Sequence, residues 1–219
     1  EVKAQGIYPW FRPIEGSEGP VVQMEGRSVI MAGSNNYLGL TAHPKVKEAA
    51  IEVLQQFGTS CSGSRYLTGT ITLHEQLEKE LAEFVGKEKA YLLNFGYQGI
   101  MSAIDALVSK NDIIVYDVDT HACIIDGVRL HPGKRFVYRH NDMESFEKNM
   151  KRAVRMAEKT GGGILAISEG VFGMRGEQGR LKEIVALKKK YNFRLLVDDA
   201  HGFGTLGKTG AGAGEEQGV

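Results

Sequence analysis

The chain has 219 residues, of which 42% are hydrophobic and 25% charged, and this composition is typical of a globular protein with one well-buried core. Basic and acidic side chains are equal at 27 each, so the net charge gives no reason to expect nucleic acid or an anionic membrane surface as a partner. The longest apolar runs have the length of strands, which excludes a transmembrane helix.

Cysteine usage and the N-terminus favour a cytoplasmic protein. Cys61 and Cys123 lie far apart and form no C-x-x-C pair, which argues against a zinc site and gives no disulfide framework. A reducing cytoplasm suits two free thiols, and residues 1–6 lack the basic start and apolar stretch of a signal peptide. Cys123 follows His121 by two positions, but residues two apart on a helix point to different faces, so we expect no Cys/His catalytic pair.

The first elements in chain order form a small antiparallel appendage. Residues 21–24 and 28–31 have strand-like sequences, and residues 25–27 between them form a hairpin-like turn. With the arm that precedes them, these strands define a first domain over residues 1–43. Residues 44–219 form the second domain.

Two helices and a polar loop follow. Pro44 suits the first turn of a helix, where an amide would lack a partner, and Gly58 ends this helix. Residues 58–69 are rich in glycine, serine and threonine, and such a loop either brings its backbone close to a ligand or lies in solvent. The sequence from Thr72 to Glu75 matches a capping box and begins the next helix.

Beyond residue 86, strands alternate with helices. We predict strands at residues 90–94, 112–116, 164–168 and 195–198, and helices at 97–108, 121–130, 142–159 and 180–191. This alternation is typical of an α/β fold, a mostly parallel sheet with helices on both faces. Ligands bind such sheets at the carboxyl ends of the strands, and a polar or glycine-bearing segment follows each predicted strand. We therefore expect a binding site along this edge.

The most informative segment is the strand that ends in Asp198-Asp199-Ala200-His201. An aspartate at the carboxyl end of a strand can keep a pyridine nitrogen protonated, and His201 is placed to reach a phenolic oxygen on the same ring. Such a ring is the electron sink of pyridoxal 5'-phosphate (PLP). The alternative is a buried strand followed by an ordinary polar turn, since short motifs also arise by chance.

Six segments carry a family resemblance that covers nearly the whole chain, namely residues 36–40, 63–65, 95–97, 121–127, 169–172 and 198–202. In this order they resemble the α-oxoamine synthases, PLP-dependent enzymes of the aspartate aminotransferase-like fold. Residues 8–14 and 58–65 are most similar to the bacterial serine palmitoyltransferase branch. The resemblance implies the large domain of PLP-dependent transferase fold type I, incomplete at its C-terminal end.

The resemblance also implies an activity and a partner. Family members condense an amino acid with an acyl thioester and release carbon dioxide, so we expect an acyltransferase of the serine palmitoyltransferase kind, with a long-chain acyl donor. Within the family, 2-amino-3-ketobutyrate ligase and 8-amino-7-oxononanoate synthase are the alternatives, and a non-catalytic binding module on the same fold is another. Family members share the active site between two subunits, which implies a homodimer.

Roles carry over from the family residue by residue. By resemblance, His121 stacks on the cofactor ring, Asp198 pairs with its pyridine nitrogen, and His201 bonds its phenolic oxygen. Gly96 and Tyr97 offer backbone amides to the cofactor phosphate at a helix start, the favoured place for a dianion. The resemblance therefore implies that His121, Asp198 and His201 form the catalytic set.

Other positions concern the substrate and the covalent attachment of the cofactor. By resemblance, Asn36 and Ser64 lie near the amino-acid substrate. The family's Schiff-base lysine, which stands in a Ser-Lys or Thr-Lys motif, has no match here. Lys208 is nearest by position, but its Gly-Lys-Thr-Gly context differs. We expect the Schiff-base lysine to lie beyond Val219.

The loop after residues 169–172 departs from many relatives. Where these continue with serine, methionine and an acidic or small residue, this chain has Gly173, Met174 and Arg175. An arginine suits a substrate whose side chain is an anion, such as the sulfonate of cysteate, because its planar fork forms charge-assisted hydrogen bonds. The alternative is an arginine that faces solvent, as most long charged side chains do.

Residues 202–209 match G-x-x-x-x-G-K-[ST], the phosphate-binding loop of the P-loop NTPases. That loop requires a helix that begins at its lysine. Here a glycine-rich stretch at residues 210–214 follows Lys208, and each glycine costs a helix about 1 kcal/mol relative to alanine. The NTPase is therefore only a remote alternative.

Overall fold

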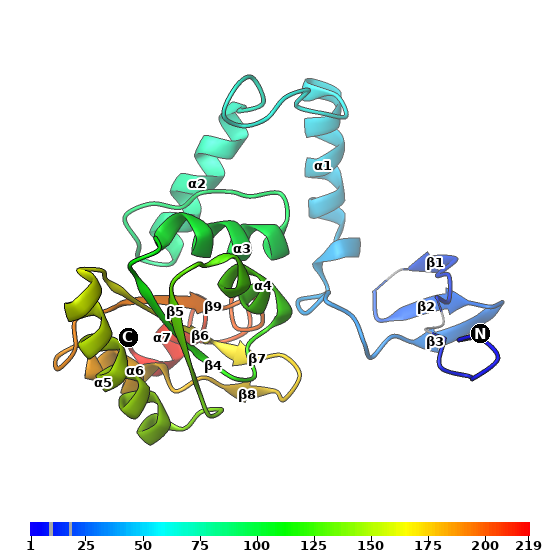
Figure 1. The fold of residues 1–219 in the computed structure, drawn as a ribbon. Helices are drawn as coiled ribbons and strands as arrows, with labels where there is room; N and C mark the ends of the chain where they lie inside the picture. The colour runs from blue at the N-terminus through cyan, green and yellow to red at the C-terminus, as the bar shows by residue number, and fades with distance from the viewer. Residues whose placement is uncertain (9–10, 18) are drawn as a thin grey trace. The chain divides into compact units, whose positions relative to one another are not determined.

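The computed structural model describes residues 1–8, 11–17 and 19–219. Contacts divide the chain into two compact units, Glu1–Thr72 and Leu73–Val219. The first unit holds the small strands and one long helix, and the second holds the main sheet and its helices (Figure 1). The domain division after residue 43 stays a prediction.

The first unit begins with a three-stranded antiparallel sheet of β1 (Gly16–Ser17), β2 (Val21–Met24) and β3 (Arg27–Ile30). Glu25 and Gly26 form the tight turn between β2 and β3, with φ angles of 53° and 69°. A two-residue turn with both φ angles positive matches the twist of a hairpin. This sheet confirms the predicted antiparallel appendage.

A long helix follows in the same unit. After the 3-10 helix η1 (Leu40–Ala42), α1 (Pro44–Phe57) begins at its proline and ends before Gly58, as predicted. Within the described chain, none of the residues of α1 is buried, and Val46, Ile51 and Leu54 are exposed. An apolar face in solvent is suited to contact with a partner.

The second unit is built on a four-stranded parallel sheet in the order β5-β4-β6-β9. Its strands are β4 (Ile113–Asp117), β5 (Lys134–Tyr138), β6 (Ile164–Glu169) and β9 (Arg194–Asp198). An antiparallel hairpin of β7 (Val171–Phe172) and β8 (Glu177–Gln178) follows β6. The remaining helices are α2 (Thr72–Phe84), α3 (Gly96–Leu107), α4 (Ala122–Leu130), α5 (Met143–Thr160), α6 (Leu181–Leu187) and α7 (Ala213–Gln217).

Helices cover both faces of this sheet, with α3 and α4 on one face and α5 and α6 on the other (Figure 1). Successive residues of a strand point to opposite faces. Val115 of β4 accordingly packs in one core with Phe146 and Met150 of α5, whereas Ile114 packs in a second core with Ile124 of α4. Every residue of β6 is buried, as expected for a central parallel strand. The structure confirms the predicted α/β fold.

Two predictions about strands are corrected. Residues 90–94 form no strand, because no strand of the described chain pairs with them, and the amide of Leu92 donates instead to the Glu78 carboxylate at 2.7 Å. Conversely, β5 is absent from the sequence prediction. It lies at the edge of the sheet and begins with the exposed side chains of Lys134 and Arg135, a charged start that is typical of an edge strand.

The predicted helices agree with α3, α4 and α5 to within one residue at each end. The exception is α6, which ends at Leu187 rather than near residue 191. The amides of Lys188 and Lys190 bond to the carbonyls three residues earlier, each at 3.0 Å. The helix thus ends in tighter turns with three-residue hydrogen bonds, and these turns provide donors for the last carbonyls of the helix.

Candidate active site

The carboxyl ends of β4, β6 and β9 meet at one edge of the sheet. Glu169 of β6 lies in register beside Asp198 of β9, and the amide of Gly170 donates to the Asp198 carbonyl at 2.8 Å. The backbone amide of His121, just ahead of α4, donates to the Glu169 carboxylate. The structure thus brings two of the predicted site residues, His121 and Asp198, to the same edge.

Asp198 presents a carboxylate that is half-buried and weakly bonded. One oxygen accepts a hydrogen bond from the Ala200 amide at 3.2 Å. Within the described chain, the partner of the other oxygen is the Cys123 thiol, 3.7 Å away, and a thiol is a weak donor. A carboxylate with acceptor capacity to spare, at the carboxyl end of a strand, is suited to a protonated ring nitrogen.

His121 caps the start of α4. Its Nδ1 accepts a hydrogen bond from the Cys123 amide at 3.3 Å and lies 3.0 Å from the Cys123 sulfur. This contact corrects the prediction that the two side chains point apart, because His121 precedes the helix instead of lying within it. Burial raises the pKa of Cys123 to about 11, and the charge of Asp198 acts in the same direction. The thiol therefore stays protonated at neutral pH and is a poor nucleophile.

Gly96 and Tyr97 form the first turn of α3. The first amides of a helix have no carbonyl partner within the helix, so this turn is suited to an anion, as the predicted phosphate site requires. The Tyr97 ring lies edge-on to the His121 ring with centroids 5.9 Å apart, and its hydroxyl donates to the Asp126 carboxylate. The start of α3 is therefore adjacent to His121.

Glu169 is a site residue absent from the sequence prediction. Its side chain is 3% exposed, and burial raises its pKa to about 7. The charges of Asp198 and Asp117 raise the pKa further, whereas the hydrogen bond from the His121 amide lowers it. The sequence signals for this residue are an acid at the end of an otherwise apolar strand and its place at the start of the family-like segment 169–172.

His201 lies against Gly173, in the turn between β7 and β8. A Cβ atom at Gly173 would stand 2.5 Å from Cε1 and 2.6 Å from Nε2 of His201. Both distances are shorter than a van der Waals contact between carbon and a ring atom, so a side chain at residue 173 would displace the imidazole. The glycine at this position permits the observed place of His201.

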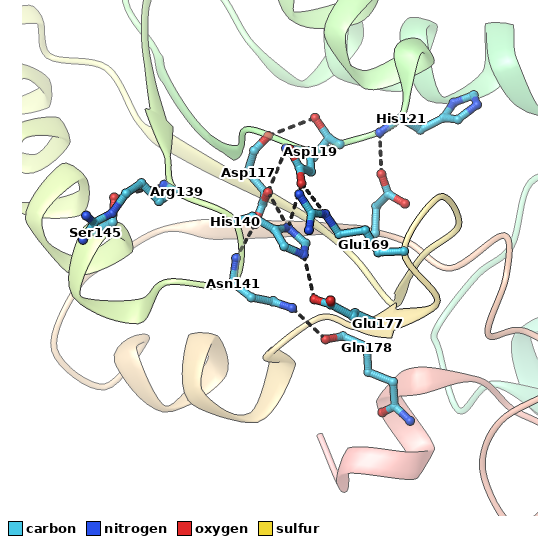
Figure 2. A network of polar contacts seen from close by, with 12 residues as sticks. Asp117, Asp119, His121, Arg139, His140, Asn141, Ser145, Glu169, Glu177 and Gln178 are labelled. Carbon is cyan, nitrogen blue, oxygen red and sulfur yellow. Dashed lines mark hydrogen bonds and ion pairs between the residues drawn. The ribbon is translucent and has the colours of Figure 1, made fainter.

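A charged network connects the ends of β4 and β5 with the β7–β8 hairpin (Figure 2). His140 is its centre. Nδ1 of His140 lies 3.0 Å from a carboxylate oxygen of the fully buried Asp117, and Nε2 lies 3.1 Å from Glu177. Arg175 pairs with Asp119, with its Nε 2.5 Å from a carboxylate oxygen. The sequence predicted that the polar segment with Asp117 and Asp119 lies at this edge and gave a substrate role to Arg175, but it did not indicate His140 or Glu177, which come from separate segments.

The network favours a positive charge on His140. Burial alone would lower the pKa of His140, but its bonds to Asp117 and Glu177 and the charge of Asp119 outweigh burial and raise it above the ordinary value. His140 thus has a greater tendency to be an imidazolium near neutral pH than a free histidine.

Asn36 and Ser64 belong to the first unit and shape local turns there. The Asn36 side chain accepts a hydrogen bond from the Thr41 amide at 3.3 Å. The Ser64 carbonyl accepts from the amides of Leu67 and Gly69, at 3.1 and 2.8 Å. Their place near an amino-acid substrate stays a prediction.

Residues 202–209 do not form a phosphate-binding loop. No helix begins at Lys208. The amides of Thr209 and Ala211 donate to the Glu215 carboxylate at 3.1 and 3.0 Å, so a carboxylate of the chain takes the backbone donors that a phosphate would need. The match to the P-loop pattern is accidental, which removes the NTPase alternative.

Asp199 organises the same loop from inside. One carboxylate oxygen accepts a hydrogen bond from the Ala213 amide at 2.9 Å, and the other is buried without a hydrogen-bond partner among the described residues. Three glycines surround this carboxylate so closely that a Cβ atom on any of them would overlap it, namely Gly170, Gly202 and Gly212. Burial raises the pKa of Asp199. Asp199 is thus a structural residue, whereas its neighbour Asp198 is at the site edge.

Some kinds of site are absent from the part of the chain that the structure describes. No helix there combines the length and apolar character needed to cross a bilayer. No histidine, cysteine or acidic side chains are grouped there in a way that could hold a metal ion. Cys61 and Cys123 are both free thiols.

The chain has a parallel sheet with helices on both faces and an aspartate and a histidine at its carboxyl edge. Its sequence also matches a known protein family. Residues 27–217 match the family model of aminotransferase class I and II. The chain therefore belongs to this PLP-dependent family. The residues at the edge fit such a cofactor, since Asp198 has acceptor capacity to spare and the adjacent start of α3 is suited to a phosphate.

Individual relatives narrow the class to the α-oxoamine synthases, which confirms the resemblance. The chain is 64% identical over 217 residues to cysteate-C-fatty acyltransferase of Capnocytophaga ochracea, covering 99% of this chain and 51% of that protein. A solved serine palmitoyltransferase of Sphingomonas wittichii has a TM-score of 0.92 and 38% identity, covering 100% of this chain and 54% of that one. The S. paucimobilis enzyme, solved with bound PLP, has a TM-score of 0.91 and 33% identity, covering 99% and 54%. The chain thus spans about half the length of these relatives.

Proposed function

We propose that the protein binds PLP at the carboxyl edge of its sheet and condenses a small amino acid with a long-chain acyl thioester, with loss of carbon dioxide. The observation that carries this proposal is the Asp198 carboxylate, which is half-buried at the end of β9 and has a weak thiol donor on one oxygen. The relationship to the α-oxoamine synthases supports the condensation reaction.

Each residue at the edge has a role in this proposal. When bound, PLP supplies an electron sink for a carbanion at the α-carbon of the substrate. Asp198 keeps a proton on the ring nitrogen, because its negative charge favours the protonated form. The His121 ring orients the cofactor, His201 holds a proton at the phenolic oxygen, and the amides at the start of α3 bind the phosphate.

For the amino-acid substrate we propose cysteate, whose side chain is an anion. The relative at 64% identity is named for cysteate, and Arg175 brings a guanidinium to the hairpin beside the site edge. Arg175 is paired with Asp119, but its side chain is 52% exposed, and a guanidinium has five N–H donors to share between two oxyanions. By resemblance, Asn36 and Ser64 are proposed to lie near the amino-acid substrate.

Absorbance and kinetics of the full-length protein test the proposal. A visible absorbance band from bound PLP is expected, and a protein without one would refute the cofactor assignment. Values of kcat/KM for cysteate, serine, glycine and alanine, with one long-chain acyl thioester, are then compared between wild type and Arg175→Ala. A charge-assisted hydrogen bond contributes about 1.5–3 kcal/mol, so the substitution should reduce the preference for cysteate roughly ten- to a hundredfold. If serine is preferred and Arg175→Ala leaves the ratios unchanged, the cysteate assignment is wrong.

We also infer a homodimer in a reducing cytoplasm. The exposed apolar side chains of α1, among them Val46, Ile51 and Leu54, support a partner surface, and the two free thiols support the compartment. Light scattering during size-exclusion chromatography of the full-length protein should give the mass of two chains. The mass of one chain would refute the dimer.

A further inference from the structure

The β7–β8 hairpin is tied to the ends of β4 and β5 at three points (Figure 2). The three contacts are His140 to Glu177 at 3.1 Å, the Asn141 side-chain amide to the Gln178 carbonyl at 3.0 Å, and Asp119 to Arg175 at 2.5 Å. All three reach residues 175–178. The place of Arg175 therefore depends on contacts made by its neighbours in the hairpin as well as on its own ion pair.

Asp117 is the anchor of this arrangement. Its buried carboxylate accepts hydrogen bonds from the amides of Asp119 and Asn141, both at 2.9 Å, and lies 3.0 Å from Nδ1 of His140. The Phe172 ring packs edge-on against His140 with centroids 4.5 Å apart. The imidazole thus packs against Phe172 and lies between Asp117 and Glu177, with one ring nitrogen toward each carboxylate.

The network carries more negative than positive charge, and a proton on His140 reduces this excess. Three carboxylates, those of Asp117, Asp119 and Glu177, face the imidazole, and among the described residues Arg175 is the one permanent cation paired with them. Nδ1 of His140 also lies 3.8 Å from the carboxylate oxygen of Asp119 that pairs with Arg175. A proton on His140 therefore offsets Asp119 and leaves more of the positive potential of Arg175 for another anion.

We propose that His140 is a positioning residue that selects the amino-acid substrate, because its imidazolium ties the hairpin to β4 and offsets Asp119 so that Arg175 accepts an anionic side chain. This inference rests on the proposed function. It makes the preference for an anionic over a neutral amino acid depend on the proton of His140. The pKa of His140 lies above its ordinary value, so the preference should be present at low pH and decline as pH rises through that pKa.

Kinetics of the full-length, PLP-loaded protein test the selection. The ratio of kcat/KM for cysteate to that for serine is measured from about pH 6 to pH 9 in wild type, His140→Gln and Arg139→Gln. Arg139→Gln is the matched control, since it removes a positive charge from the same turn, and its 77% exposed side chain pairs with Asp142 outside the network. We expect the wild-type ratio to fall with pH more steeply than the His140→Gln ratio, whose remaining pH dependence reflects Glu169 with its pKa of about 7. At low pH the His140→Gln ratio should be about tenfold below wild type, equal to about 1.4 kcal/mol. A His140→Gln ratio that follows wild type would overturn the proposal.

A second measurement does not depend on turnover. Amide hydrogen exchange over residues 171–178 should become about tenfold faster in His140→Gln than in wild type, and should be unchanged in Arg139→Gln, if His140 ties the hairpin. Equal exchange in all three proteins would overturn the proposal even in an active enzyme. If wild type converts neither amino acid, the proposed function fails, and the exchange data alone then decide whether His140 holds the hairpin.

Discussion

Glu169 should make the folded protein less stable as pH rises. Burial raises its pKa to about 7 in the folded state, against about 4.5 for an exposed glutamate. Since the folded state binds the proton more tightly than the unfolded chain, the stabilisation from this group is fully present below about pH 4.5 and is lost as pH rises through about 7. At 1.36 kcal/mol per pKa unit, the whole effect is roughly 3 kcal/mol, of which about 2.5 kcal/mol falls between pH 5 and pH 8.

The variant Glu169→Gln isolates this contribution. Its amide oxygen can still accept the hydrogen bond from His121, but it cannot ionise. The free energy of unfolding in urea, measured on cofactor-free full-length protein, should favour the variant over wild type by about 2.5 kcal/mol more at pH 8 than at pH 5. Titrating groups that do not interact with Glu169 cancel in this difference, and Glu158→Gln, on the exposed side of α5, is the matched control. A difference between Glu169→Gln and wild type that does not change with pH would refute the reasoning.

Three further substitutions test the site in full-length protein. Asp198→Asn should keep the visible absorbance of bound PLP but nearly abolish turnover, because an amide cannot hold the proton on the ring nitrogen, and wild-type turnover would contradict this role. Lys208→Ala should change neither PLP binding nor activity, and loss of the absorbance band together with ATP binding by wild type would reverse the conclusion about the loop. Gly173→Ala should displace His201 and lower kcat, whereas Met174→Ala, at a fully exposed neighbour, should not; equal kcat values would show that the place of His201 is immaterial.

Periodicity predicted the elements whose signal is local. The apolar face of α5 and the buried run of β4 each show in the residue pattern of one continuous segment, and both elements were predicted to within one residue at each end. A strand, by contrast, exists only beside a partner strand. Residues 90–94 have a strand-like sequence but no partner strand in the described chain. By contrast, β5 pairs with β4, although its charged Lys134 and Arg135 make its sequence unlike that of a strand.

The residues of the site also differ in whether a local sequence signal identifies them. Asp198 and His121 could be predicted because each lies in a short motif at the end of a strand or the start of a helix, and the structure brings both to one edge. His140 and Glu177 could not, because their contact joins segments far apart in the sequence and neither segment has a motif of its own. Burial, which raises the pKa of Glu169, is likewise a property of the fold and not of the residue.

The carboxylate of Asp199 makes substitutions at distant positions interdependent. Gly170 and Gly202 are separated by β7, β8, α6 and β9, yet both lack room for a side chain because the same carboxylate oxygen, Oδ1 of Asp199, fills the space. Exchanging either glycine alone should be deleterious, whereas the exchange of Gly202 after Asp199 has become smaller should be milder, at the expense of the bond to Ala213. Gly170 would still be limited, because an added Cβ atom there would lie 2.8 Å from the Cβ of Ala213. Gly212 would stay constrained by its φ of 103°. The order in which mutations arise, and not only their identity, would then decide how this loop can evolve or be redesigned.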